Sequence, residues 1–277
     1  MITTTSPTPA ALSAPSLAPR HSIRSAGDDL RALPSLLRAE RIKLTSLRAT
    51  RAVAVMSTLV SALAAWAVAT WVTDEVLTVT DVFVYPAVLT AALSAVAGIV
   101  VFTSEAQHGT LAATLTARPA RWLLATAKAI TAVAGGIAIG AAGMIGGVVG
   151  SLVGGLEVGA LSGMPATIAW ALLYSSLAAL IGLGVGMVVR HSSAAISGLL
   201  VWWFVVENMV LTFAPAKVAR LLPFDAGYRI LGVGSDFDTP EILAIALTPP
   251  QYALIFAGYA AATMLAGSIV LHRRDTN

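Results

Sequence analysis

The sequence contains no cysteine, which excludes disulfide bonds, thiolate metal sites and thiol nucleophiles. Charged residues are also scarce, at 11% of 277 residues, whereas soluble proteins carry roughly a quarter. Hydrophobic residues make up 57% of the chain, and the mean hydropathy is +0.83. So few charges cannot cover a water-exposed surface, which makes a soluble enzyme or a nucleic-acid-binding module a poor candidate. The composition instead predicts a protein of the lipid bilayer.

Motifs that bind nucleotides or metals are missing as well. No Gly-Lys pair occurs, so the chain lacks the phosphate-binding loop that would hold ATP. The four histidines are scattered, and Asp236, Asp238 and Glu241 lack the glycine and the spacing of a calcium-binding EF-hand loop. We therefore expect no catalytic residue, no bound cofactor and no metal on this chain. Energy for any active process would have to come from another chain.

Six apolar stretches are long enough to cross a bilayer, which takes about 20 helical residues. They are residues 52–72, 82–103, 125–156, 167–189, 194–213 and 252–271. Fourteen of the 17 lysines and arginines fall on the side that holds both termini, and the positive-inside rule places that side in the cytoplasm. The predicted fold class is an all-α integral membrane protein with six transmembrane helices and both ends inside the cell.

Glycines recur along the third of these stretches, from Gly136 to Gly154, and again at Gly182 and Gly186 in the fourth. Small residues let helix backbones approach closely in lipid, where no hydrophobic force drives helices together. Such glycines serve either an interface with another subunit or packing within the chain, and the sequence leaves both open.

The chain before the first span divides into two parts. Residues 1–29 are predicted to form a disordered cytoplasmic tail, since their first 19 residues are rich in Ser, Thr, Pro and Ala and have no charge. From residue 30 to residue 51 the leucines gather on one face of a helix, with Arg31 and Arg38 off that face. This amphipathic interfacial helix would lie on the anionic membrane surface or simply anchor the chain. Its candidate residues are Leu33, Leu37, Glu40, Lys43 and Leu44.

One carboxylate, Glu207, lies inside a predicted span, beside Asn208 and four residues after Trp203. An acidic side chain in a membrane is costly unless it is paired, protonated or facing water, so it is a functional candidate by default. These three residues could line a translocation path, where Glu207 would meet a cationic substrate or a proton. Alternatively, Glu207 could hydrogen-bond to a neighbouring span or a partner subunit.

The loop between the second and third spans carries a docking pattern. Gly109 and Thr110 can cap a short helix whose Leu111 and Leu115 share one face, and Pro119 would end it. The basic residues Arg118 and Arg121 flank this helix. A short helix with an apolar face suits the groove of a partner protein, although it could also rest on the membrane surface.

The order of these elements resembles the type-2 ABC exporter permeases, six-span bacterial subunits whose ATPase is a separate chain. Glu40-Arg41-Ile42-Lys43-Leu44 is similar to that family's E-x-x-K-L entry segment. Glu105 followed by Gly109-Thr110-Leu111 is similar to its E-x-x-x-G-T-L element. Pro119, Arg121 and Lys128 follow that element in an order that also resembles the family. Leu221-Leu222-Pro223-Phe224 before the last span and Arg273-Arg274-Asp275 at the end also resemble the family.

The resemblance implies a fold and a set of partners. Residues 30–277 would form the permease domain, which dimerises with an identical or homologous permease and sits on two copies of an ABC ATPase. ATP and Mg²⁺ would bind to that ATPase, and this chain would be no enzyme itself. The interfacial helix would be the family's elbow helix, and residues 217–250 would dip back into the outer leaflet. Coupling to the ATPase would fall to Glu105, Gly109, Thr110, Leu111, Leu115, Arg118 and Arg121.

The implied function is export of a hydrophobic or amphipathic substrate, such as a drug, a lipid-like metabolite or a peptide, across the plasma membrane of a bacterium by alternating access. Partners would then be the lipid bilayer and the ATPase, with no nucleic acid. Two other functions stay open. One is a non-transporting membrane anchor or regulatory subunit for a cytoplasmic ATPase, and the other is an ion-coupled secondary transporter that uses Glu207.

Overall fold

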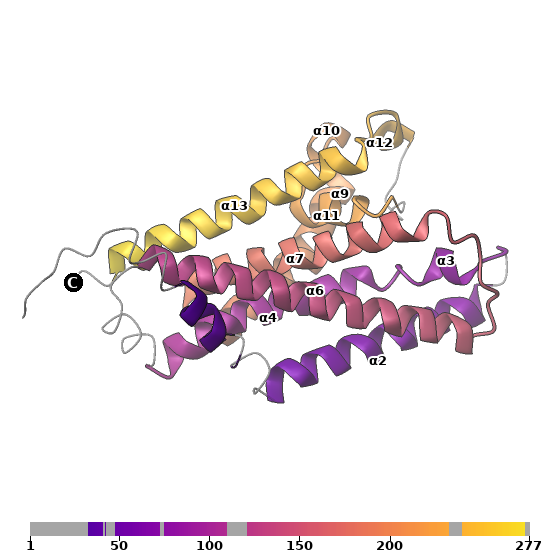
Figure 1. The fold of residues 1–277 in the computed structure, drawn as a ribbon. Coiled ribbons are helices and arrows are strands. Elements are labelled where there is room, and N and C mark those ends of the chain that lie inside the picture. Colours follow the sequence, from indigo (N-terminus) through magenta and orange to yellow (C-terminus); the bar gives the residue numbers. More distant parts are fainter. Residues whose placement is uncertain are drawn as a thin grey trace, which may run out of the picture.

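A computed structural model of the chain describes residues 33–40, 42, 48–72, 75–109, 121–232 and 240–274, and every regular element in these ranges is helical (Figure 1). Six stretches are long and apolar enough to span a membrane. They are α2 (Arg48–Trp71), α3 with α4 (Val79–Val82 and Ala87–Gln107), α6 (Arg121–Val153), α7 (Met164–Val189), α8 with η1 and α9 (Ser192–Val201, Trp202–Val206 and Glu207–Phe213), and α13 (Pro249–Arg274). The predicted fold class, an all-α protein with six spans, is confirmed.

The spans run alternately in opposite directions, which gives the bundle two distinct ends. One end, which we call the basic end, carries Arg51, Arg121, Arg190 and Arg273. It is the left-hand end in Figure 1, where α4 and α13 finish and α6 begins. The outer end, so called because it is the end opposite the predicted cytoplasmic side, carries acidic residues such as Glu157.

Span boundaries differ from the predicted ones by a few residues. The second span was expected from residue 82, but Pro86 separates the short α3 from α4, which runs from Ala87 to Gln107. Proline has no backbone N–H to donate, so the helix starts afresh after it. The third span begins at Arg121 rather than at residue 125, and its added first turn includes Leu123 and Leu124, which are buried against the bundle.

Glycines bring the helix backbones together within the chain. A β-carbon on Gly150 of α6 would collide with the carbonyl of Ala62 in α2, and one on Gly182 of α7 would collide with the carbonyl of Ala95 in α4. Gly136 of α6 likewise faces Ser175 and Ser176 of α7. These contacts favour packing within the chain over a subunit interface as the role of the glycines.

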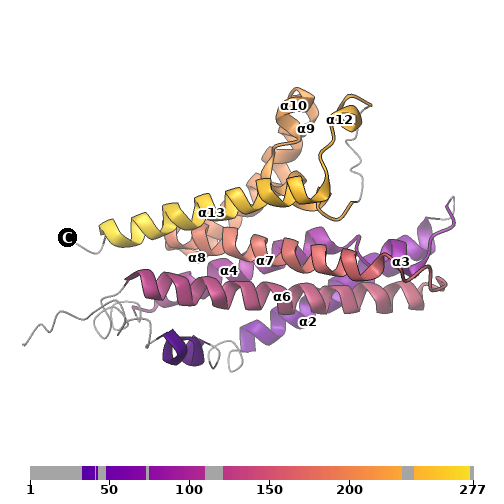
Figure 2. The ribbon, with the colours of Figure 1, turned by 45° about the horizontal axis from the view of Figure 1, so that its top comes forward.

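Between the fifth and sixth spans, the described residues form three short helices: α10 (Ala216–Ala219), α11 (Pro223–Arg229) and α12 (Pro240–Ala244). Figure 2 shows α9, α10 and α12 standing away from the layer formed by α4, α6 and α7. By contrast, Phe224, Ala226 and Ile230 in and after α11 are buried in the main hydrophobic core. The segment expected to re-enter the outer leaflet therefore returns to the bundle at α11.

The N-terminal helical segment covers residues 33–40 in the described part of the chain. Leu33 and Leu37 are half-buried, Glu40 is buried and Arg38 is exposed, as an amphipathic helix requires. The predicted tail of residues 1–29 lies outside the described residues, and so do Lys43 and Leu44 of the predicted interfacial helix.

Candidate functional site

A buried cluster of charges lies at the basic end, and we call it the Lys128 cluster. The ammonium of Lys128 lies 2.9 Å from Glu105 Oε1 and 3.7 Å from Glu40 Oε1. It also donates a hydrogen bond of 3.1 Å to the carbonyl oxygen of Val101. Lys128 is fully buried, Glu105 is 9% exposed and Glu40 is 6% exposed. Three parts of the chain that are far apart in sequence therefore meet at one ammonium group.

Each member of the Lys128 cluster is positioned by a different helix. Lys128 stands in the second turn of α6, Glu105 in the last turn of α4, and Glu40 in the N-terminal helical segment. Val101 and Glu105 are four residues apart and so share a face of α4, which lets one lysine reach both. Buried charges are stable only when partners and hydrogen bonds replace water. The cluster thus fixes the N-terminal segment to the spans electrostatically.

Arg121, at the start of α6, holds the end of the last span. Its Nη1 donates hydrogen bonds to the carbonyl oxygens of Leu271, at 3.2 Å, and His272, at 2.7 Å. These carbonyls belong to the final turn of α13, where a helix has no internal donors left and its dipole favours a cation. The sequence assigned Arg121 to contact with an ATPase, whereas its guanidinium joins span three to span six.

Ser192 makes a third connection at the basic end. Its hydroxyl oxygen lies within hydrogen-bonding distance of Thr103 Oγ1, at 2.7 Å, and of Gln107 Oε1, at 2.8 Å, and its one hydrogen bonds to either of them. The first turn of α8 is therefore bound to the last turns of α4. The preceding turn reverses the chain through Arg190, whose φ of 59° is left-handed. Span five is thereby tied to the helix that leads into the 110–120 loop.

The predicted coupling segment is described only at its two ends. Gly109 has a φ of 72°, which ends α4 in the left-handed conformation that glycine adopts most readily. Glu105 and Arg121 are placed in the contacts given above. Thr110, Leu111, Leu115 and Arg118 lie outside the described residues, so the predicted docking helix stays a prediction.

Two of the three candidates in span five, Glu207 and Trp203, contact α11, and the third, Asn208, bonds within its own span. Glu207 Oε1 accepts a hydrogen bond of 2.6 Å from the backbone N–H of Asp225, and Glu207 is only 2% exposed. The ring of Trp203 stacks on Phe224, with centroids 3.8 Å apart and planes 11° from parallel. Asn208 Nδ2 donates to the carbonyl oxygen of Phe204 at 3.0 Å. Of the two interpretations of Glu207, a hydrogen bond to a neighbouring part of the protein is the one that this geometry supports.

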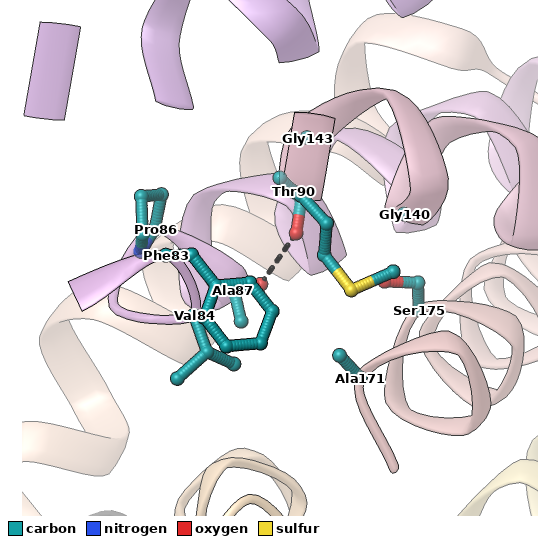
Figure 3. A pocket seen from close by; sticks show the side chains of 10 residues that line it. Phe83, Val84, Pro86, Ala87, Thr90, Gly140, Gly143, Ala171 and Ser175 are labelled. Atoms are coloured by element: carbon teal, nitrogen blue, oxygen red, sulfur yellow. Dashed lines mark hydrogen bonds between the residues drawn. The ribbon is translucent and has the colours of Figure 1, made fainter. Parts of the chain in front are cut away.

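A small hollow lies between α4, α6 and α7, close to the outer end (Figure 3). It is too narrow to hold a water molecule. Phe83 and Ala171 line it, and the hydroxyl of Thr90 bonds to the carbonyl of Ala87 within its own helix. This hollow provides no passage for a substrate.

Sequence reasoning missed Lys128 as a site residue, although a signal was present. Lys128 is the single cation in the predicted apolar stretch 125–156, and an ionisable residue in such a place normally has a partner. The connections of Ser192 and Arg121 carried no signal, because hydroxyl and carbonyl partners occur throughout the chain.

No protein-family model matches this chain, and no curated protein matches it either.

Proposed function

We propose that this multi-pass membrane protein is the permease subunit of an ATP-driven ABC exporter in the plasma membrane of a bacterium. One observation carries the proposal: the two ends of the 110–120 loop are fixed to other parts of the bundle. Before the loop, Glu105 contacts Lys128 of span three, and Ser192 binds Gln107. After it, Arg121 holds the end of span six. A force applied to this loop would reach four spans and the N-terminal segment.

Such connections suit a segment through which a partner protein moves the spans. In the proposed mechanism, two copies of a separate ATPase bind beneath the basic end, where they hold ATP and Mg²⁺. Their closure on ATP displaces the 110–120 loop, and the bonded spans move with it between two arrangements. A second permease, identical or homologous, completes the assembly.

The substrate path is proposed to lie between the two permeases rather than within one. The hollow between α4, α6 and α7 is too narrow for water, so it supplies no route through a single chain. Apolar side chains are exposed along α2 and span five, among them Leu63, Phe204 and Val205. A path bordered by such side chains favours a hydrophobic or amphipathic substrate, such as a drug, a lipid-like metabolite or a peptide.

The two alternative functions are distinguished by specific contacts. An ion-coupled secondary transporter would need Glu207 to exchange protons or ions with water, whereas Glu207 is buried and accepts a backbone hydrogen bond. A non-transporting anchor would need to bind an ATPase, but it would not need to transmit the movement of that ATPase to the spans. The bonds from Glu105 and Arg121 to spans three and six favour transmission.

The proposal is tested by purifying the tagged chain from its native membranes and measuring ATPase activity of the complex in lipid nanodiscs. We expect an ATPase with a phosphate-binding loop to co-purify at one copy per permease. Leu111→Asp should abolish this association, because it places a charge on the predicted docking face. Leu161→Asp is the matched control, since Leu161 is 59% exposed at the outer end. Retention of the ATPase by both variants would rule out the assigned docking segment.

A second variant tests transmission rather than binding. Glu105→Ala should leave the ATPase bound but reduce transport per ATP hydrolysed, because the end of α4, which precedes residues 110–120, loses its contact with Lys128. An anchor without transport would hydrolyse ATP equally well with Glu105 or alanine. Equal transport by both proteins would contradict the coupling role of Glu105.

A further inference from the structure

Span five is broken by an unusually wide helical turn. Residues Trp202–Val206 form a π-helix, in which the N–H of Glu207 donates to the carbonyl oxygen of Trp202, five residues earlier. Asn208 adds side-chain hydrogen bonds to the carbonyl oxygens of Trp203, at 3.4 Å, and Phe204, at 3.0 Å. A π-turn contains one residue more than an α-turn and is rare outside functional sites. Asn208 therefore stabilises a turn that the backbone alone would seldom adopt.

Glu207, the residue that follows this turn, holds α11 in place. Glu207 accepts the N–H of Asp225, the third residue of α11, and so satisfies a donor that has no partner within that helix. Trp203, one turn earlier, stacks on Phe224 of α11. Tyr174 of α7 lies beside Trp203, with ring centroids 6.4 Å apart. We call these contacts of span five with α11 the Glu207 latch.

The wide turn and the latch depend on each other. If the π-turn closed to an α-turn without loss of a residue, everything after it would rotate by about 100° about the helix axis. Glu207 would then leave the N–H of Asp225, while Trp203, inside the turn, would lose its stacking partner. An α-turn at this place would therefore release α11, whereas the π-turn in the structure holds it.

We propose that the Glu207 latch is a conformational switch, in which the π-turn of span five sets whether α11 is bound to the bundle or free. Glu207 acts as a positioning residue and contacts no substrate. Release of α11 would loosen the outer end between spans five and six. The link between this release and substrate exit rests on the proposed transport function, whereas the switch itself does not.

The absence of native cysteine allows a direct test in the full-length protein. Ala226→Cys places a thiol in α11 at a position that is 0% exposed. In right-side-out membrane vesicles, its reaction rate with a membrane-impermeant maleimide reports release of α11. Glu207→Ala should raise this rate by about tenfold, the effect expected when a buried N–H, here that of Asp225, loses its acceptor. Thr212→Val is the matched control, because Thr212 bonds only to its own helix through the carbonyl of Asn208.

The conservative variant separates the latch from a general loss of structure. Glu207→Gln keeps an oxygen that can accept the N–H of Asp225, so its labelling rate should stay within about threefold of the parent. The proposal is overturned if alanine labels no faster than the Thr212→Val control, or if glutamine labels as fast as alanine. Each variant is first required to elute as a single species on gel filtration.

A deletion tests the switch in the opposite direction. Removing Val205, which is 49% exposed, takes the extra residue out of the π-turn and leaves a continuous α-helix with Glu207 still facing α11. Labelling at residue 226 should then fall to or below the parent rate. A rise to the Glu207→Ala rate would overturn the hinge role of the π-turn. These rates are measured without an ATPase, so they do not depend on whether the exporter proposal holds.

Discussion

Removal of the Lys128 ammonium should strongly destabilise the protein. Lys128→Met keeps the length of the side chain but leaves Glu105 and Glu40 facing each other without the ammonium between them. Both carboxylates are almost completely buried, so water cannot replace the lost cation. Methionine also loses the hydrogen bond to the carbonyl of Val101.

The magnitude follows from the distances. At an effective dielectric constant of about 20, charges at 2.9 Å and 3.7 Å attract by roughly 6 and 4.5 kcal/mol before desolvation is subtracted. Breaking a buried ion pair by removing one partner costs about 3–5 kcal/mol net. For a chain of this size that corresponds to a fall in Tm of roughly 10 °C. Glu105→Gln should cost more than Glu40→Gln, because Glu105 is the closer partner.

The assay is thermal unfolding in nanodiscs, followed by intrinsic tryptophan fluorescence at one fixed scan rate. The informative comparison is between Lys128→Met and the triple variant that also carries Glu105→Gln and Glu40→Gln. The triple variant buries no net charge in the cluster and should recover at least half of the lost Tm. If Lys128→Met unfolds within 2 °C of the parent, or the triple variant is no more stable than the single one, the electrostatic account of the cluster is wrong.

The remaining predictions concern packing and helix ends. Gly136→Ala should lower the Tm, since its β-carbon would lie 2.7 Å from a carbonyl oxygen of α7. Gly135→Ala has open space around it and should gain up to about 1 kcal/mol of stability from helix propensity. Equal changes in Tm for the two variants would contradict the packing. Arg121→Ala should speed amide exchange in the last turn of α13, and unchanged exchange there would argue against its capping role. Ser192→Ala should cost about 1 kcal/mol through loss of its bonds to α4, measured as a lower Tm than that of Ser193→Ala.

Hydropathy alone predicted the six spans because each one is a continuous apolar run, and a bilayer requires nothing more specific of the residues facing it. It could not locate the break at Pro86 within the second span, since the residues on both sides are apolar. Hydropathy could not predict the π-turn at Trp202–Val206 either. An α-turn and a π-turn of the same composition differ only in which carbonyl accepts each N–H, and no sequence pattern identifies that carbonyl.

An isolated charged residue in an apolar stretch could be predicted as a site residue, but the group that it contacts could not. Glu207 stood out as an acidic residue inside a span, but its partner is a backbone N–H, which no sequence pattern identifies. Glu105 and Glu40 came from the resemblance to separate motifs, and their meeting at Lys128 depends on how three helices pack. Arg121 was predicted to contact an ATPase, which stays a prediction, and its contacts with α13 span about 150 residues of sequence, which no local pattern indicates.

The chain order of the Lys128 cluster has a consequence for biosynthesis. A ribosome delivers Glu40 first, Glu105 second and Lys128 last. Until α6 has emerged, Lys128 is not yet present to neutralise the two carboxylates in a buried site, which favours their remaining at the membrane surface. Entry of the third helix then completes the ionic contact and secures the N-terminal segment after the first two spans are already inserted. The cluster therefore makes the attachment of the earliest helical segment a late event in assembly.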